Sequence, residues 1–192
     1  MRSDARSLFE ATTAATRRDW LLIAARDPRK RTMDNPPDRL AAILDLIQIL
    51  DSLELPYALI GGVAVGIHSG APRATADTDV AVRSTVTRSA AREALTNRGF
   101  RLVGEHAHSL NFRHPLGEPV QLAFDPSFDA MIDRAERFDL GGRTLRIVKK
   151  DDLIVMKERA AADPGRRRSK SLRDQADVAL LRGDVPDPDE GW

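Results

Sequence analysis

Asp77 and Asp79 are the residues of this chain whose spacing points most directly to chemistry. The apolar pattern of residues 78–82 predicts a short strand. Because side chains two residues apart on a strand point to the same face, the two carboxylates should emerge side by side. Carboxylates that close repel each other unless a cation lies between them. The pair therefore predicts a metal site, and its hard oxygen ligands are those that Mg²⁺ prefers.

Gly61 and Gly62 form a second feature, a glycine pair directly after the apolar run 57–60. The run predicts a buried strand that breaks at the glycines, after which residues 63–68 can form a short helix. The amides at the start of that helix would face an anion. Glycines also let backbone amides approach a phosphate closely. The pair therefore predicts a phosphate-binding turn.

The glycine pair followed by Arg73-Ala74-Thr75-Ala76-Asp77-Thr78-Asp79 resembles the nucleotidyltransferase superfamily of polymerase-β-like fold. Within it, the likeness is to bacterial AbiEii-type and minimal nucleotidyltransferases, many of which are toxins of toxin–antitoxin pairs. It covers roughly residues 38–182. It implies an α/β fold, with a nucleotidyltransferase-like mixed β-sheet flanked by helices and a helical C-terminal part. The alternative is a Gly-Gly turn beside two aspartates at a strand edge.

Nucleotidyl transfer displaces pyrophosphate from an NTP by attack on the α-phosphorus. The resemblance implies that Gly61 and Gly62 hold the β and γ phosphates and that Asp77 and Asp79 hold Mg²⁺. Arg73 is predicted to bind the nucleotide by bracing a phosphate, and the alternative is a structural salt bridge to either aspartate. We interpret Thr75, which lies in the same motif, as structural.

Lys157 is a further predicted nucleotide-binding residue, because it follows Asp151-Asp152-Leu153-Ile154 at the place where the resemblance puts a helix beside the nucleotide. The alternative is a solvated helix lysine. The segment 173–178 resembles the K-D-x-x-D-[VL] sequence of the same proteins. Its Asp174 and Asp177 would share a helix face and could pair with Lys157 or Arg73, so we interpret them as structural.

Gln121 is the departure from the resemblance. Active members carry a third carboxylate on the next central strand, and in the segment 120–126 Gln121 occupies that position. We place it in the catalytic site with Asp77 and Asp79, although its amide cannot accept the proton of an attacking hydroxyl. Asp125 lies about 13 Å farther along an extended strand, too far to replace it, and is interpreted as a turn residue.

The elements that must position these residues follow from apolar periodicity and turn residues. Asn35-Pro36-Pro37 predicts the start of an amphipathic helix that continues to about residue 50. Further helices are predicted over 87–98, 151–162 and 171–181, strands over 100–103, 109–113, 119–124, 138–140 and 144–148, and a charged linker over 163–170.

Composition limits the remaining classes. The 192 residues contain no cysteine, which favours a reducing cytoplasm. Their net charge is only +1, so the charge of the whole molecule would not attract nucleic acid. The basic segment 166–170 is a local candidate for RNA contact, with a solvated loop as the favoured alternative. No apolar run is long enough to cross a bilayer, so we expect no membrane partner.

The predicted organisation is an N-terminal appendage over 1–32, a nucleotidyltransferase-like domain over 33–182 and a flexible tail over 183–192. An ordinary N-terminal helix packed on the domain is the alternative for the first segment. The predicted function is metal-dependent transfer of a nucleotide from an NTP to an RNA or protein acceptor, as by a toxin with a cognate antitoxin. The rival, motivated by Gln121, is a catalytically weakened nucleotide-binding module for regulation or partner binding. No Walker lysine motif, nucleophile elbow or Rossmann glycine motif supports another class.

Overall fold

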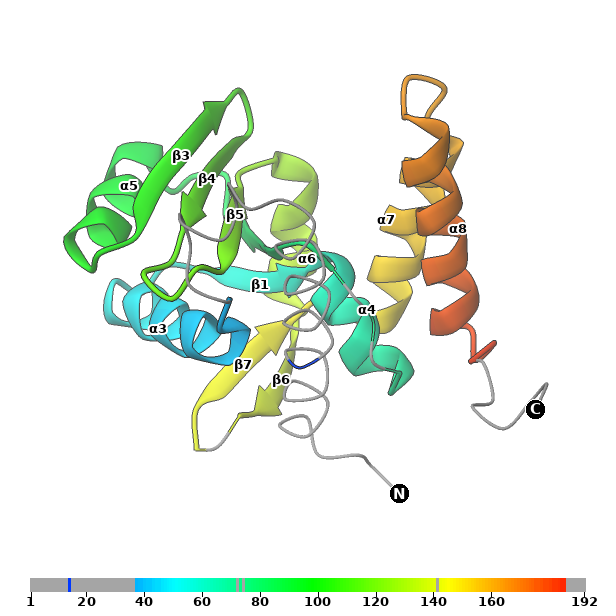
Figure 1. The fold of residues 1–192 in the computed structure, drawn as a ribbon, viewed down its shortest axis with the longest axis horizontal. Coiled ribbons are helices and arrows are strands. Elements are labelled where there is room, and N and C mark those ends of the chain that lie inside the picture. Colours follow the sequence, from blue (N-terminus) through cyan, green and yellow to red (C-terminus); the bar gives the residue numbers. More distant parts are fainter. Residues whose placement is uncertain (1–13, 15–36, 72, 74, 141, 186–192) are drawn as a thin grey trace, which may run out of the picture.

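The computed structural model describes residues 14, 37–71, 73, 75–140 and 142–185 (Figure 1). The predicted appendage 1–32, apart from Ala14, lies outside the described residues. So do the predicted domain start at 33, the Asn35-Pro36 helix signal, Gly141 of the predicted hairpin turn and residues 186–192 of the tail. Within the described part, no helix is long and apolar enough to cross a membrane.

A seven-stranded mixed sheet forms the centre of the molecule, in the order β3-β4-β5-β2-β1-β7-β6. The β1–β7 and β2–β5 pairs are parallel, and the other neighbouring pairs are antiparallel. The strands are β1 Tyr57–Ile60, β2 Thr78–Val82, β3 Arg101–His106, β4 Ser109–Arg113, β5 Pro119–Ala123, β6 Glu136–Asp139 and β7 Thr144–Ile147. All seven predicted strands are present, and their edges differ from the predictions by a few residues at most.

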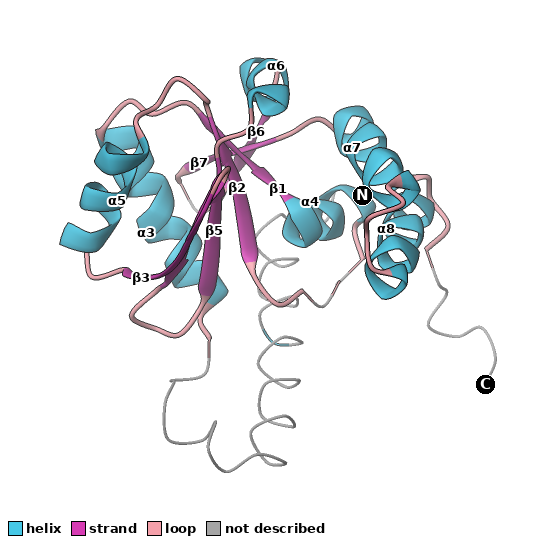
Figure 2. Ribbon diagram, turned by 90° about the horizontal axis from the view of Figure 1, so that it is seen from above, coloured by secondary structure: helices cyan, strands magenta, loops and turns pink. Residues whose placement is uncertain are grey.

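Helices cover both faces of the sheet, as Figure 2 shows. Helices α3 (Arg39–Ser52) and α5 (Arg88–Asn97) lie on one side, and α4 (Gly61–Ser69), α7 (Lys150–Ala162) and α8 (Arg168–Leu181) lie on the other. The predicted α/β class, with a mixed sheet and a helical C-terminal part, is confirmed.

Helix α3 illustrates how the sequence sets a helix and its buried face. Asp38 is the N-cap, and its side chain accepts a hydrogen bond from the Ala41 amide at 3.0 Å. Ile43, Leu46 and Leu50 follow at helical spacing and are buried in the core.

Two local predictions need correction. Pro126–Phe128 form a 3-10 turn that leads into a short helix, α6 (Asp129–Asp133), in a segment for which no helix was predicted. Asp125 does act in a turn, because it accepts from the Ser127 amide at 2.9 Å. The predicted linker 163–170 is too long, since α8 already begins at Arg168 and thereby includes residues 168–170 of the basic segment.

Candidate active site

Asp77 and Asp79 lie at the N-terminal end of β2, a central strand. Asp79 is the register partner of Ile60 on β1 and of Gln121 on β5. Burial, and then the neighbouring charge of Asp77, raise the pKa of Asp79 to about 7, against the opposing effect of nearby cations led by Lys157. The two carboxylates are therefore close enough to repel each other, as their spacing predicts.

This donor set fits a hard divalent cation. A cation between Asp77 and Asp79 would remove the repulsion and favour ionised Asp79, and carboxylate oxygens suit Mg²⁺. Within the described part of the chain, no cluster of three or more acidic, histidine or cysteine residues could hold a metal. Asp77 and Asp79 would therefore act with water and substrate oxygens.

Gly61 and Gly62 begin α4 directly against these carboxylates. Gly61 has a φ of +70°, and a Cβ placed on it would collide with the Asp79 carboxylate oxygen Oδ2. A Cβ on Gly62 would collide with the Arg73 guanidinium and come within 2.7 Å of the Thr75 hydroxyl. Both positions therefore require glycine, because the backbone at the start of α4 touches the side chains of the motif.

Arg73 and Lys157, the cations predicted to bind nucleotide, contact the acidic face of α8. Arg73 forms a two-pronged ion pair with Asp177, in which Nη2 donates to Oδ2 at 3.0 Å and Nε donates to Oδ1. Lys157 Nζ lies 2.8 Å from Asp177 Oδ2 and 3.0 Å from Asp174 Oδ1. The predicted pairing of Asp174 and Asp177 with Lys157 or Arg73 is therefore confirmed.

Arg166 extends this cluster, because its Nε donates to Asp174 Oδ2 at 2.5 Å. Asp174 and Asp177 are both buried, and Lys157 keeps only 12% of its side chain exposed. The solvated-lysine alternative for Lys157 is therefore wrong. The cluster joins the loop before β2 to α7 and α8.

A buried ion pair, which the sequence did not predict, contacts the segment that carries the aspartate motif. Arg39 Nε donates to Glu118 Oε1 at 2.7 Å, and both side chains are fully buried. Arg39 Nη2 also donates to the Thr75 carbonyl at 2.9 Å, and the Thr78 hydroxyl donates to Glu118 Oε1 at 2.8 Å. The buried pair could have been suspected from the sequence, because a charged residue, Arg39, lies at the start of the apolar stripe of α3.

Gln121 lies beside Asp79, as the register of β2 and β5 shows. On its other side, Gln121 pairs in register with Asn111 of β4. Asn111 was not singled out from the sequence, and its Oδ1 is buried without a hydrogen-bond partner in the described structure. Asp79 on β2, Gln121 on β5 and Asn111 on β4 thus form one row across three adjacent strands.

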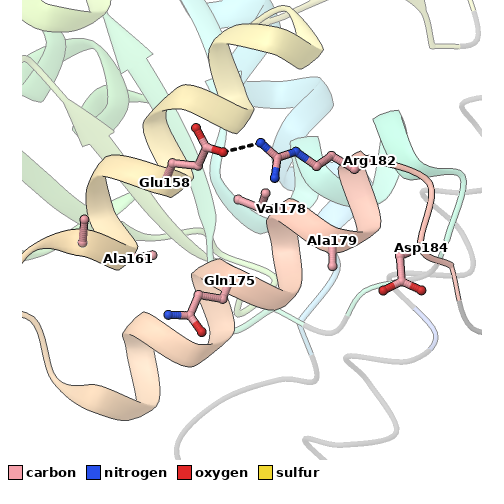
Figure 3. A pocket seen from close by; sticks show the side chains of 8 residues that line it. Glu158, Ala161, Gln175, Val178, Ala179, Arg182 and Asp184 are labelled. Atoms are coloured by element: carbon pink, nitrogen blue, oxygen red, sulfur yellow. Dashed lines mark hydrogen bonds and ion pairs between the residues drawn. The ribbon is translucent and has the colours of Figure 1, made fainter.

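A separate pocket of about 590 Å³ lies between α7 and α8 and is shown in Figure 3. Its lining includes Val178, Ala179 and Gln175, and an ion pair of 2.5 Å between Glu158 and Arg182 crosses it. None of the predicted site residues lines this pocket.

Comparison with known proteins places this geometry in a recognisable fold. No protein-family model matches the chain, and no curated protein matches it. Among solved structures, an antigenic nucleotidyltransferase-like protein from Paracoccidioides brasiliensis superposes with a TM-score of 0.51 and 24% identity, over 79% of this chain and 78% of that one.

Two further structures are similar. ANT(2″)-Ia, solved in complex with adenylyl-2″-tobramycin, has a TM-score of 0.53 and 16% identity, over 76% of this chain and 90% of its own. The lincosamide antibiotic adenylyltransferase LnuA, solved with lincomycin, has a TM-score of 0.53 and 14% identity, over 74% and 95%. These likenesses show the fold, so the predicted nucleotidyltransferase-like architecture is confirmed.

Proposed function

We propose that this protein is a metal-dependent nucleotidyltransferase that uses an NTP as donor. The observation that carries the proposal is the contact between the glycine start of α4 and the Asp79 carboxylate. It brings a phosphate-binding backbone next to a metal-binding acid pair, which are the two features that handling a triphosphate requires. The fold shared with an adenylyltransferase supports the same class.

Each residue of the site has a role in this proposal. The amides at Gly61 and Gly62 hold the terminal phosphates, and Asp77 and Asp79 hold Mg²⁺. When bound, such an ion neutralises phosphate charge and polarises the reacting phosphorus. Lys157 and Arg73 both pair with Asp177, and their charges oppose the rise in the pKa of Asp79, so they are the cations proposed to face the triphosphate.

The acceptor is proposed to be RNA or protein, and the biological role that of a toxin with a cognate antitoxin. These finer assignments come from the AbiEii-type resemblance. Mg²⁺ is proposed because Asp77 and Asp79 offer carboxylate oxygens, and a cytoplasmic location because the chain has no cysteine. The two neighbours were solved with small molecules, adenylyl-2″-tobramycin and lincomycin.

A nucleotide-binding module without turnover is the second candidate. Gln121 offers no base beside Asp79, which favours this reading. Arg73 and Lys157 are also already neutralised by Asp177 and Asp174, so they would bind phosphate only by sharing or exchanging these partners.

Labelled transfer separates the two candidates. The protein is incubated with each α-labelled NTP, Mg²⁺, total RNA and protein extract, and both pyrophosphate release and labelled product are measured. We expect both signals from the unaltered chain and a loss of at least about 100-fold in Asp77→Asn and Asp79→Asn. Asp51→Asn, an exposed change on α3, is the matched control. Retained Mg²⁺-dependent NTP binding with no pyrophosphate release would favour the binding module.

A further inference from the structure

The start of α8 carries a concentrated positive charge at the tip of the hairpin formed by α7 and α8, which projects from the rest of the fold (Figure 1). Residues 165–173 include five basic residues and no acidic one. Arg166 is paired with Asp174, so its charge is already balanced. The other four are exposed and form no ion pair with any described residue: Arg167, Arg168, Lys170 and Arg173.

Helical spacing places three of these side chains on the face of α8 that carries the two buried aspartates. Lys170 lies four residues before Asp174 and seven before Asp177. Arg173 lies four residues before Asp177, and Arg167, the N-cap, lies three before Lys170. Residues at these intervals line one face of a helix. We refer to Arg167, Lys170 and Arg173 as the basic stripe.

The other side of α8 has a different character. Arg168 and Leu172 each lie two residues from Lys170, which places them about 160° around the helix from it. Leu172 is 52% exposed, so the exposed apolar side chain of this helix is not part of the basic stripe. The centre of a protein interface is rich in apolar and aromatic side chains, whereas Lys and Arg hold the phosphates of a nucleic acid. The basic stripe therefore suits a phosphate backbone better than a protein surface.

The basic stripe also leads to the candidate active site. Asp177 pairs with Lys157, and the charge of Lys157 acts on Asp79. Because an α-helix rises about 1.5 Å per residue, Lys170 lies about 10 Å and Arg167 about 15 Å from Asp177 along the axis of α8. A strand with its end at the site would therefore pass the basic stripe with its neighbouring nucleotides.

We propose that the basic stripe binds the phosphate backbone of a nucleic-acid acceptor whose end enters the candidate active site. The inference rests on the proposed function, because it selects nucleic acid from the two acceptor classes named there. Each of the three side chains pairs with one backbone phosphate, which Arg can bind with two parallel hydrogen bonds. The occupant is chosen by charge complementarity and by the position of the stripe beside Asp174 and Asp177.

Salt-dependent binding tests the stripe without catalysis. A fluorescent single-stranded RNA, and DNA of the same sequence, are titrated with protein at several KCl concentrations in the absence of NTP. The slope of log K against log salt is about −0.7 for each phosphate neutralised on a single strand. Lys170→Gln and Arg173→Gln should therefore each flatten the slope by about 0.7 and weaken binding severalfold. Arg168→Gln removes the same charge from the other side of α8 and should leave both nearly unchanged.

The two strands identify the source of the phosphates. Equal effects of the stripe variants on RNA and DNA would show that the stripe contacts the backbone alone, and effects on RNA only would identify RNA as the acceptor. Equal losses in Arg168→Gln and Lys170→Gln would overturn the inference, because binding would then depend on the net charge of the hairpin. Binding that persists unchanged when all three stripe residues are replaced by Gln would also overturn it. Polyglutamate that competes as well as RNA would overturn it in favour of an acidic protein partner.

Transfer and NTP binding separate this inference from the proposed function. In labelled transfer to the same RNA, Lys170→Gln and Arg173→Gln should raise the KM for RNA severalfold with little change in kcat, because neither side chain contacts the reacting atoms. Mg²⁺-dependent NTP binding should be the same in these variants as in the unaltered chain. Absence of NTP binding in the unaltered chain would count against the proposed function, whereas intact NTP binding with no effect of the stripe variants on RNA would count against this inference alone.

Discussion

Gly61 touches Asp79 because it has no side chain and adopts a φ that other residues rarely tolerate. The strand before it and the strand that carries Asp79 are hydrogen-bonded neighbours, so the turn cannot move away from the carboxylate. The glycine turn and Asp79 are therefore one structural unit.

Gly61→Ala should destroy this unit. The added Cβ would displace the Asp79 carboxylate, in addition to a strain of about 1–2 kcal/mol from the left-handed backbone. Gly70→Ala is the matched control, because Gly70 has a φ of +71° and open space around its Cβ position. Denaturation and NTP titration should show similar destabilisation by strain in both variants but loss of nucleotide binding only in Gly61→Ala. Normal NTP affinity in Gly61→Ala would contradict the contact.

The pH dependence of the free energy of unfolding reports the burial of Asp79 and its repulsion by Asp77. Folded Asp79 holds its proton to about pH 7, whereas an unfolded aspartate loses it near pH 4. Between these values the folded state binds more protons, so the free energy of unfolding should fall as pH rises. In EDTA, urea titrations from about pH 5 to about pH 8 should show this fall in the unaltered chain and a flatter profile in Asp79→Asn. Parallel pH profiles of the unaltered chain and Asp79→Asn would mean that the pKa of Asp79 is not raised in the folded state.

The site residues that lie together in one motif could be predicted from the sequence, whereas those brought together only by the pairing of strands could not. Asp77, Asp79 and the glycines could be found because strand periodicity alone places them. Asn111 enters the site only through the register of β4 on β5, which no local pattern specifies. Gln121 could be predicted because the resemblance marked its position.

At the scale of elements, the Arg39–Glu118 pair connects α3 to the loop before β2 and to the start of β5. It is buried on both sides, so neither charge can be solvated if the other is removed. The pair therefore fixes where the aspartate motif lies relative to the sheet.

Breaking this pair should cost much more than breaking a surface pair. Arg39→Met leaves the Glu118 charge buried, and we expect a loss of about 3–5 kcal/mol in urea denaturation. The double variant Arg39→Met/Glu118→Gln should recover part of it, because no charge is then stranded. Glu158→Gln, which breaks an exposed pair between α7 and α8, should cost about 1 kcal/mol or less. Equal losses in Arg39→Met and Glu158→Gln would show that Arg39 is not a structural anchor.

Most elements could be predicted because their apolar spacing is regular and glycines or prolines mark their ends. Helix α6 could not, since a helix of five residues is too short to show a period. The start of α8 was misplaced because Arg168 to Lys170 carry only charged and polar side chains, and contacts made elsewhere in the chain support that turn. One is the hydrogen bond from the Ser171 hydroxyl to the Ala161 carbonyl at 2.5 Å.

At the scale of the whole molecule, α7 and α8 lie side by side at one end of the fold and reach the site through Asp174 and Asp177 (Figure 1). Lys157 and Arg73 approach the same aspartate from different segments. The C-terminal helices are thereby joined to the motif loop by charge, and a triphosphate bound at Gly61 would meet this cluster.

The most direct test is calorimetric titration of the protein with each NTP, with and without Mg²⁺. We predict that at least one NTP binds the unaltered chain in a Mg²⁺-dependent manner, and that Asp77→Asn and Asp79→Asn remove this dependence while the exposed control Asp51→Asn keeps it. NTP affinity that is the same with and without Mg²⁺, or unchanged in both aspartate variants, would contradict a nucleotide site built on Asp77 and Asp79.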